Sequence, residues 1–188
     1  MGKRIPLLLV VIGVAAFLVP PLWGETPTSP GQRDCPSCLS FGVQRFPEKK
    51  TASPFSLKAL DGNTIALSEL KGKPVLLVFW ASWCLGCREE VPLMEKFSVG
   101  KRDQLIILTM AIDGEKEKRI QRFVNKYKIT LPVLLDAKEK IARTYGVTMV
   151  PTVFLINGEG LLIGKIVGQR DWSSSEASSA IKELLDLR

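Results

Sequence analysis

The sequence predicts an α/β domain of three layers, in which helices cover both faces of a mixed central sheet. Two continuous apolar runs, at 74–82 and 104–113, are each followed by a helical pattern, as in a buried sheet with parallel strands. A hairpin signal stands near each end of the domain, and hairpins add antiparallel pairs. The chain has 188 residues, of which 46% are hydrophobic, enough for one such domain with a core.

The individual elements follow from periodicity and turn chemistry. Asp61-Gly62 between two short alternating runs predicts the first hairpin, and the run at 74–82 predicts a strand buried on both faces. The helix after that strand contains Pro92, which predicts a kink. The later elements are a strand at 104–113, an amphipathic helix with Ile120, Phe123, Val124 and Tyr127 inward, a short strand at 131–136, a helix at 137–145, two strands around a hairpin at 157–160, and a last helix at about 174–187.

Composition excludes several kinds of chemistry. The sequence contains no histidine, which rules out a Cys-His or Ser-His catalytic pair and a His-ligated zinc or copper site. Neither CxxC motif is followed by the histidine that covalent haem attachment needs. The formal net charge is +7, but acidic and basic residues are interspersed, so no nucleic acid is expected as a partner. We expect no cofactor and no metal.

The N-terminal part of the chain predicts export and attachment to a membrane. Two basic residues precede an apolar run at 7–19, the pattern of a signal peptide or a signal anchor, which we assign to 1–23. Trp23 lies where an interfacial anchor residue would, and this favours an uncleaved anchor. Residues 24–53 are rich in proline, glycine and serine and predict an extended tether. The folded domain is then expected at 54–188.

The motif "WCLGC" carries the expected chemistry. Cys84 stands where a buried strand turns into a helix, and the positive end of the helix dipole lowers the pKa of a thiol there. Cys87 lies one turn further, on the apolar face, and is expected to stay buried and protonated. Cys84 would then exchange with a substrate disulfide, and Cys87 would resolve the mixed disulfide. Glu90 is either a proton relay to Cys87 or an exposed helix glutamate.

A second signal is "TMVPTVF" at 148–154. Its proline opens a strand after a break at Gly146, a position at which a cis bond is possible. Because a trans bond is far more common before proline in folded proteins, the residues alone leave both forms open.

These motifs carry a resemblance to a known family. "FWASWCLGCREEVP" and, further along, "YGVTMVPTVFLINGEG" resemble a thioredoxin-fold thiol-disulfide oxidoreductase, and "SPFSLKALDGNTIALSELKGKPVLLVFWASWC" is similar to the TlpA/ResA-like group. The resemblance implies a thioredoxin-like three-layer fold with a mixed central sheet, an N-terminal hairpin and a βα insertion. It implies a cis Pro151 that faces the cysteines, substrate binding by Trp83, Val150 and Pro151, and Glu90 as the active-site glutamate.

The resemblance also implies a function. Members of this group reduce disulfides in exported proteins, among them apocytochrome c cysteines, at the periplasmic face of the membrane. They receive electrons from a transmembrane thiol donor. One departure is the dipeptide Leu85-Gly86, which replaces the common Gly-Pro or Glu-Pro and leaves the reduction potential and the choice of partner open.

Two other functions fit the cysteine motifs less well. A thiol peroxidase of the peroxiredoxin type favours a Thr/Ser-x-x-Cys site, whereas Trp83 precedes Cys84 here and a resolving thiol lies one turn away. A zinc-binding or structural protein would use all four cysteines, but Cys38 and Cys84 are further apart than the usual ligand pairs.

The remaining cysteines, Cys35 and Cys38, lie in "DCPSC" within the expected tether. A local disulfide that closes a tight turn is one interpretation, because the compartment is oxidising. An electron relay that swings on the tether to meet Cys84 or a membrane donor is another. Metal binding and an intermolecular bridge remain as further alternatives.

Overall fold

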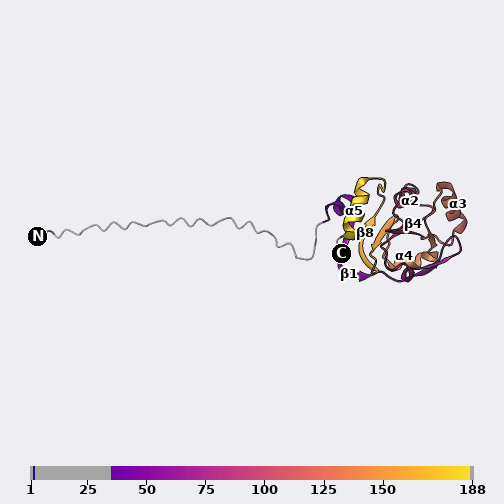
Figure 1. Ribbon diagram of the computed structural model, residues 1–188, viewed down its shortest axis with the longest axis horizontal. Coiled ribbons are helices and arrows are strands. Elements are labelled where there is room, and N and C mark those ends of the chain that lie inside the picture. The colour runs from indigo at the N-terminus through magenta and orange to yellow at the C-terminus, as the bar shows by residue number, and fades with distance from the viewer. Residues whose placement is uncertain (1, 3–34, 187–188) are drawn as a thin grey trace. The chain divides into compact units, whose positions relative to one another are not determined.

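The computed structural model describes residue 2 and residues 35–186 (Figure 1). Apart from Gly2, the segment expected to anchor the chain, 1–23, lies outside the described residues, as does the first part of the expected tether. None of the helices in the described part of the chain is both long enough and apolar enough to cross a membrane.

A mixed sheet forms the centre of the domain, with the strand order β1-β8-β7-β4-β5-β6. Its strands are β1 (Val43–Thr51), β4 (Val75–Trp80), β5 (Ile106–Ala111), β6 (Val133–Leu135), β7 (Thr152–Ile156) and β8 (Leu161–Val167). β4, β5 and β6 pair in parallel, and β7, β8 and β1 add antiparallel pairs. Every residue of β4 is buried, as the continuous apolar run predicted.

Helices cover both faces of this sheet. The helices are α1 (Pro36–Phe41), α2 (Leu85–Ser98), α3 (Glu117–Tyr127), α4 (Lys140–Thr144) and α5 (Ser175–Asp186), with short 3₁₀ turns at Leu67–Leu70 and Ala137–Glu139. Successive side chains of a strand point to opposite faces. Trp80 of β4 packs against Phe123 of α3, whereas Phe79 packs against Tyr145 at the end of α4. The predicted α/β three-layer class is confirmed.

The first predicted hairpin forms a small sheet of its own. β2 (Ser56–Lys58) and β3 (Thr64–Ala66) pair antiparallel around the turn at Asp61-Gly62. The helix predicted at 137–145 is divided, because Lys138 and Glu139 adopt positive φ angles and α4 begins only after them.

The prediction of an extended tether at 24–53 is wrong for residues 35–51, which form a helix and a strand. α1 and β1 belong to the folded domain, and β1 is the edge strand that pairs with β8 (Figure 1). The prediction took the prolines of this segment as signs of a linker, but they occupy positions that a helix and an edge strand tolerate. Pro36 occupies the first turn of α1, where the missing N–H costs nothing, and Pro47 falls in the irregular stretch between Arg45 and Lys50. The folded domain therefore includes the residues from Cys35 to Thr51 that were expected in the tether.

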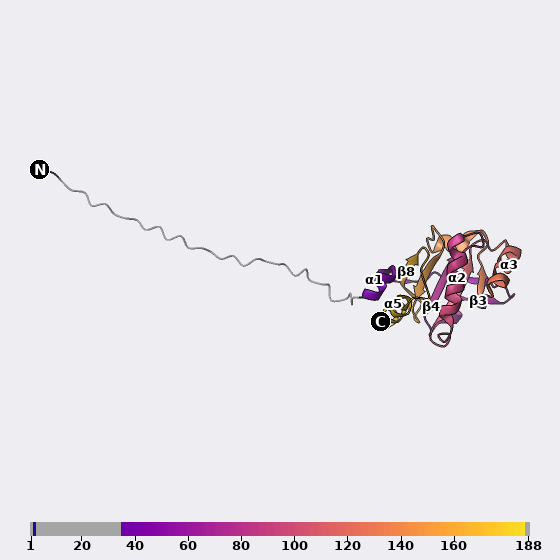
Figure 2. The same ribbon diagram turned by 90° about the horizontal axis from the view of Figure 1, so that it is seen from above.

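α1 lies beside α5 in both views of the molecule (Figure 1 and Figure 2). Its buried side chains are Cys38 and Phe41, and Val43 continues the buried face into β1. A close approach secures β1. A Cβ atom on Gly164 of β8 would stand 2.9 Å from Val43 Cγ1, so the absence of a side chain there lets β1 pack.

Candidate active site

Cys84 and Cys87 lie at the start of α2, directly after the central strand β4. Cys84 is the N-cap residue of α2, and the two sulfurs form a disulfide. The Cys87 backbone N–H donates a hydrogen bond to Cys84 Sγ at 3.1 Å. Cys84 is 6% exposed, whereas Cys87 is fully buried. The N–H donor and the helix dipole both stabilise negative charge on Cys84 once the disulfide is reduced.

Pro151 lies against the same turn. The Val150–Pro151 peptide bond is cis, as the family resemblance implied. Cys84 Sγ lies 3.6 Å from the Val150 carbonyl oxygen. A Cβ atom on Gly86 would stand 3.7 Å from Pro151 Cδ, so the dipeptide between the cysteines faces this proline. The structure thus brings together two segments that the sequence keeps far apart.

Three exposed apolar side chains are sequence neighbours of Cys84 or of Val150. Trp83 and Leu85 flank Cys84 and are 56% and 73% exposed, and Met149, which precedes Val150, is 54% exposed. Large apolar side chains with such exposure mark a surface suited to a protein partner. Trp83 was expected here from the sequence, and Met149 was not.

Glu90 is buried on α2, so the alternative of an exposed helix glutamate is wrong. Its carboxylate accepts hydrogen bonds from the Arg170 backbone N–H at 2.8 Å and from Trp172 Nε1 at 3.1 Å. Burial raises the pKa of Glu90 to about 7, against the opposing effect of these two hydrogen bonds and of the Arg170 charge. Glu90 lies three residues after Cys87, on the same face of the helix.

Comparison with known proteins agrees with this geometry. The model of the AhpC/TSA family matches residues 49–164. The thioredoxin-like protein YneN of Bacillus subtilis is 38% identical over 123 residues, which cover 64% of this chain and 70% of YneN. The thiol-disulfide oxidoreductase ResA of Bacillus anthracis is 38% identical over 121 residues, with the same two coverages. The chain belongs to the ResA-like thiol-disulfide oxidoreductases of the AhpC/TSA family.

Solved structures of two similar proteins have the same thioredoxin-like fold as this ResA-like chain. A protein from Chlorobium tepidum described as thiol:disulfide interchange protein DsbE has a TM-score of 0.67 at 29% identity, over 73% of this chain and 97% of that one. StoA from Bacillus subtilis has a TM-score of 0.58 at 26% identity, over 67% and 96%. The named relatives are thiol-disulfide oxidoreductases or thioredoxin-like proteins, and this favours disulfide exchange over the peroxidase alternative.

Sequence reasoning missed a buried contact that fixes the turn before Cys84 in this ResA-like chain. Asp113 follows β5 and accepts hydrogen bonds from Ser82 Oγ at 2.6 Å and from the Ser82 backbone N–H at 3.2 Å. The two residues follow neighbouring parallel strands, whose carboxyl ends meet at one edge of the sheet. The positions of Ser82 and Asp113 just after two predicted parallel strands were the signal in the sequence that could have indicated this contact.

It also missed the segment after β8, residues 168–172. Gln169 Nε2 donates to the exposed Glu89, while Arg170 and Trp172 supply the two donors to Glu90. No local pattern marks these residues, because their partners lie on another element.

The second cysteine pair lies outside the residues that match the family model. Cys35 and Cys38 form a disulfide at the start of α1, and they are 5% and 1% exposed. The local disulfide is therefore what the structure contains, although within a folded element and not a tether. In the described part of the chain, no three His, Cys, Asp or Glu side chains are grouped to hold a metal ion.

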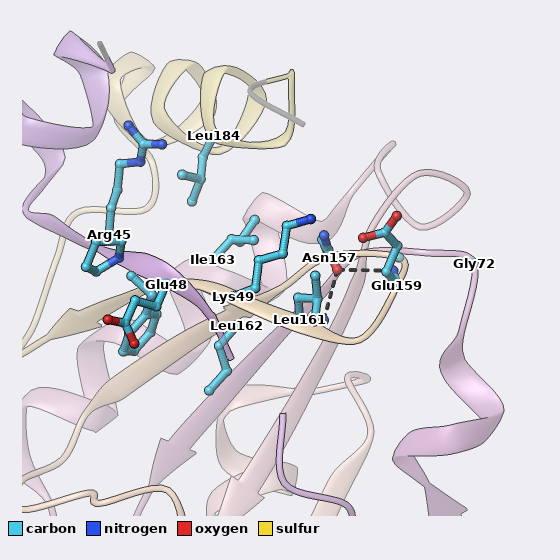
Figure 3. A pocket seen from close by; sticks show the side chains of 13 residues that line it. Arg45, Glu48, Lys49, Gly72, Asn157, Glu159, Leu161, Leu162, Ile163 and Leu184 are labelled. Carbon is cyan, nitrogen blue, oxygen red and sulfur yellow. Dashed lines mark hydrogen bonds between the residues drawn. The ribbon is translucent and has the colours of Figure 1, made fainter. Parts of the chain in front are cut away.

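A cavity of about 600 Å³ lies away from the cysteines, beside the irregular stretch of β1 (Figure 3). Its lining includes Lys49 and Glu159, with Leu162 and Leu184 as apolar wall. In Figure 3 the Asn157 side chain turns back onto its own loop, where it accepts from the backbone N–H groups of Glu159 and Leu161. Since neither Cys84 nor Cys87 lines this cavity, we assign it no part in the exchange reaction.

Proposed function

We propose that this chain is an extracytoplasmic disulfide reductase, in which the Cys84–Cys87 dithiol passes two electrons to disulfides of exported proteins. The observation that carries the proposal is the position of Cys84: at the N-cap of α2, with an N–H donor on its sulfur, beside a cis-proline loop and an exposed apolar surface. The ResA relatives, named as thiol-disulfide oxidoreductases, support the same reaction.

The reaction starts from the reduced dithiol. The Cys84 thiolate attacks one sulfur of the substrate disulfide, so that a mixed disulfide forms and the other substrate sulfur leaves as a thiolate and takes a proton. Cys87 then loses its proton and attacks Cys84 Sγ. The substrate leaves as a dithiol, and the Cys84–Cys87 disulfide of the structure is formed. A dithiol donor restores the reduced state by the reverse exchange.

Glu90 is proposed as the group that takes the proton from Cys87. A buried thiol can attack only as a thiolate, and bulk water does not reach Cys87. A carboxyl with a pKa of about 7 exchanges protons near neutral pH, whereas one with an ordinary pKa would be too weak a base.

The substrate would lie along the cis-proline loop. We assign Trp83, Val150 and Pro151 to substrate binding, with the Val150 backbone pairing to an extended segment of the substrate protein. Trp83, Leu85 and Met149 offer apolar contact area around the Cys84 sulfur. Apolar contacts together with backbone pairing would tolerate substrates of different sequence.

The cellular setting is also part of the proposal. The N-terminal segment would hold the domain on the outer face of the cytoplasmic membrane, where a transmembrane thiol donor could supply electrons. Apocytochrome c cysteines, which must be reduced before haem is attached, are a substrate of the expected kind.

Reduction of insulin by dithiothreitol tests the assigned roles. We expect Cys84→Ser to reduce the rate to that of dithiothreitol alone, because the attacking sulfur is absent. Cys87→Ser should instead accumulate a mixed disulfide between Cys84 and the substrate, visible by mass spectrometry without reductant. Equal rates for Cys84→Ser and the parent chain would refute the function, and trapping on Cys87 in the Cys84→Ser variant would reverse the two roles.

A further inference from the structure

The C-terminal end of α1 contacts both residues that donate hydrogen bonds to Glu90. The rings of Phe41 and Trp172 pack edge to face, with centroids 5.2 Å apart. Arg170 Nε donates to the Phe41 carbonyl oxygen at 3.1 Å. Trp172 is 1% exposed, and the ring of Phe97 of α2 also packs against it, with centroids 5.2 Å apart. The surroundings of Glu90 are therefore built partly by an element outside the region that matches the family model.

Gly42 makes this contact possible. It caps α1 with a φ of +79°, a conformation that L side chains rarely adopt. A Cβ atom at this position would stand 2.7 Å from Arg170 Nη2 and 2.9 Å from Arg170 Nε. The Arg170 side chain thus occupies the space that a side chain at Gly42 would fill.

The Cys35–Cys38 disulfide fixes the other end of α1. Both sulfurs are buried, and Cys38 Sγ lies 3.9 Å from the Ala180 carbonyl oxygen of α5. The Ser37 backbone N–H donates to Glu183 Oε2 of α5 at 3.1 Å. Because a helix of six residues is unstable in isolation, the cross-link and the packing on α5 must hold α1 in place.

We propose that the Cys35–Cys38 disulfide is a positioning device for the exchange at Cys84–Cys87. It holds α1 so that Phe41 and Gly42 keep Arg170 and Trp172 on the Glu90 carboxylate. The inference rests on the proposed role of Glu90 as the proton acceptor for Cys87. It assigns no electron transfer to Cys35 or Cys38.

The consequence is a change in the proton affinity of Glu90. The charged side chain that acts on Glu90 from the segment after β8 is that of Arg170. α1 carries no charged side chain between Pro36 and Phe41, and on α2 the thiol of Cys87 lies one turn before Glu90 when the disulfide is reduced. Burial has the largest effect on the pKa of the Glu90 carboxyl, which it raises. When α1 detaches, water reaches Trp172 and Glu90, and the pKa of Glu90 should fall from about 7 toward the ordinary value of 4.5.

The test compares variants of the full chain in two separate measurements: the pKa measurement uses protein whose Cys84–Cys87 disulfide is intact, and the insulin assay uses protein whose Cys84–Cys87 pair is kept reduced by dithiothreitol. The pKa of Glu90 is read from its side-chain carboxyl carbon by NMR, and the pH profile of insulin reduction is recorded alongside. Cys35→Ser/Cys38→Ser removes the cross-link, and Phe41→Ala removes the Trp172 contact while keeping the cross-link. Leu39→Ala is the matched control, because Leu39 lies on the exposed face of the same helix.

We expect the Glu90 pKa and the pH profile to move to lower pH in both test variants and to stay unchanged in Leu39→Ala. A Glu90 pKa of about 7 in Cys35→Ser/Cys38→Ser would overturn the inference. A Glu90 pKa of about 7 in Phe41→Ala would overturn it as well, because the disulfide is proposed to act through the contact between Phe41 and Trp172. If the double variant does not fold, the single variant Cys35→Ser, which also lacks the cross-link, takes its place. Failure of the proposed Glu90 role looks different: Glu90→Gln would then leave the pH profile of the parent chain unchanged.

Discussion

The burial of Glu90 affects both the stability of the fold and the proposed proton transfer from Cys87. Its carboxyl is fully buried, and the charged residue beside it, Arg170, reaches it mainly through a backbone N–H. Such a group is stable in its protonated form, because burial penalises the charged form. The same property that lets Glu90 take a proton from Cys87 near neutral pH therefore costs stability whenever the carboxyl is ionised.

This cost gives a prediction for Glu90→Gln. The folded pKa, about 7, exceeds the unfolded value of 4.5, so the folded state binds more protons between these limits and stability falls as pH rises through the window. A shift of this size corresponds to about 3 kcal/mol, which the parent should lose between pH 4.5 and pH 8. Urea unfolding without reductant should show this loss in the parent and not in Glu90→Gln.

The neighbouring Glu89→Gln serves as the control, because Glu89 is exposed on the same helix. It should keep the pH dependence of the parent. If Glu90→Gln also keeps it, the carboxyl does not titrate near neutral pH and cannot act as proposed.

At the residue scale, the sequence was sufficient to place Cys84, Cys87 and Glu90 near one another. They follow at intervals of three, with Cys84 at the N-cap and the other two on one face of α2. Arg170 and Trp172 were not predictable, because they lie 80 and 82 positions from Glu90 and meet it only through tertiary packing. The cis bond at Pro151 could be expected only from the family resemblance, since proline alone leaves the bond undetermined.

Among the elements, α1 and β1 were the ones that sequence reasoning missed. Their prolines and glycine resemble a linker, yet each fits its place: Pro36 in the first helical turn, Gly42 at the cap, and Pro47 in an irregular stretch of an edge strand. Most of the other strands and helices were predictable because their apolar runs alternate in the order β, α, β, although the helix predicted at 137–145 is divided. Packing on α5 and β8, which no local pattern encodes, makes the linker-like segment part of the domain.

The fit between β1 and β8 gives a prediction for Gly164→Ala. The new Cβ would stand 2.9 Å from Cγ1 of Val43, a buried β-branched side chain whose χ1 angle is restricted. We expect a loss of about 1–3 kcal/mol in the free energy of unfolding, as for other overpacked sites.

Val43→Ala/Gly164→Ala should recover part of this loss, because removing the Val43 methyl groups makes room for the new Cβ. The double variant should therefore be more stable than the sum of the two single losses implies. Losses that add within about 0.5 kcal/mol would contradict the close approach.

At the scale of the whole molecule, the two disulfides lie in different surroundings and are proposed to have different roles. Cys84–Cys87 lies beside an exposed apolar surface and a cis-proline loop, whereas Cys35–Cys38 is packed between α1 and α5. Geometry of this kind supports exchange at the first pair and positioning at the second. The direction of electron flow depends on the reduction potential of the Cys84–Cys87 pair relative to those of its partners.

The reduction potential of the Cys84–Cys87 pair tests the central claim most directly. The full chain is equilibrated with dithiothreitol at known ratios of dithiol to disulfide, and thiol alkylation with mass spectrometry reports each cysteine pair separately. A reductase requires a value near that of thioredoxin, about −270 mV, and this is the result we predict. A value near about −120 mV, typical of a strong oxidant, would contradict the proposed direction of transfer.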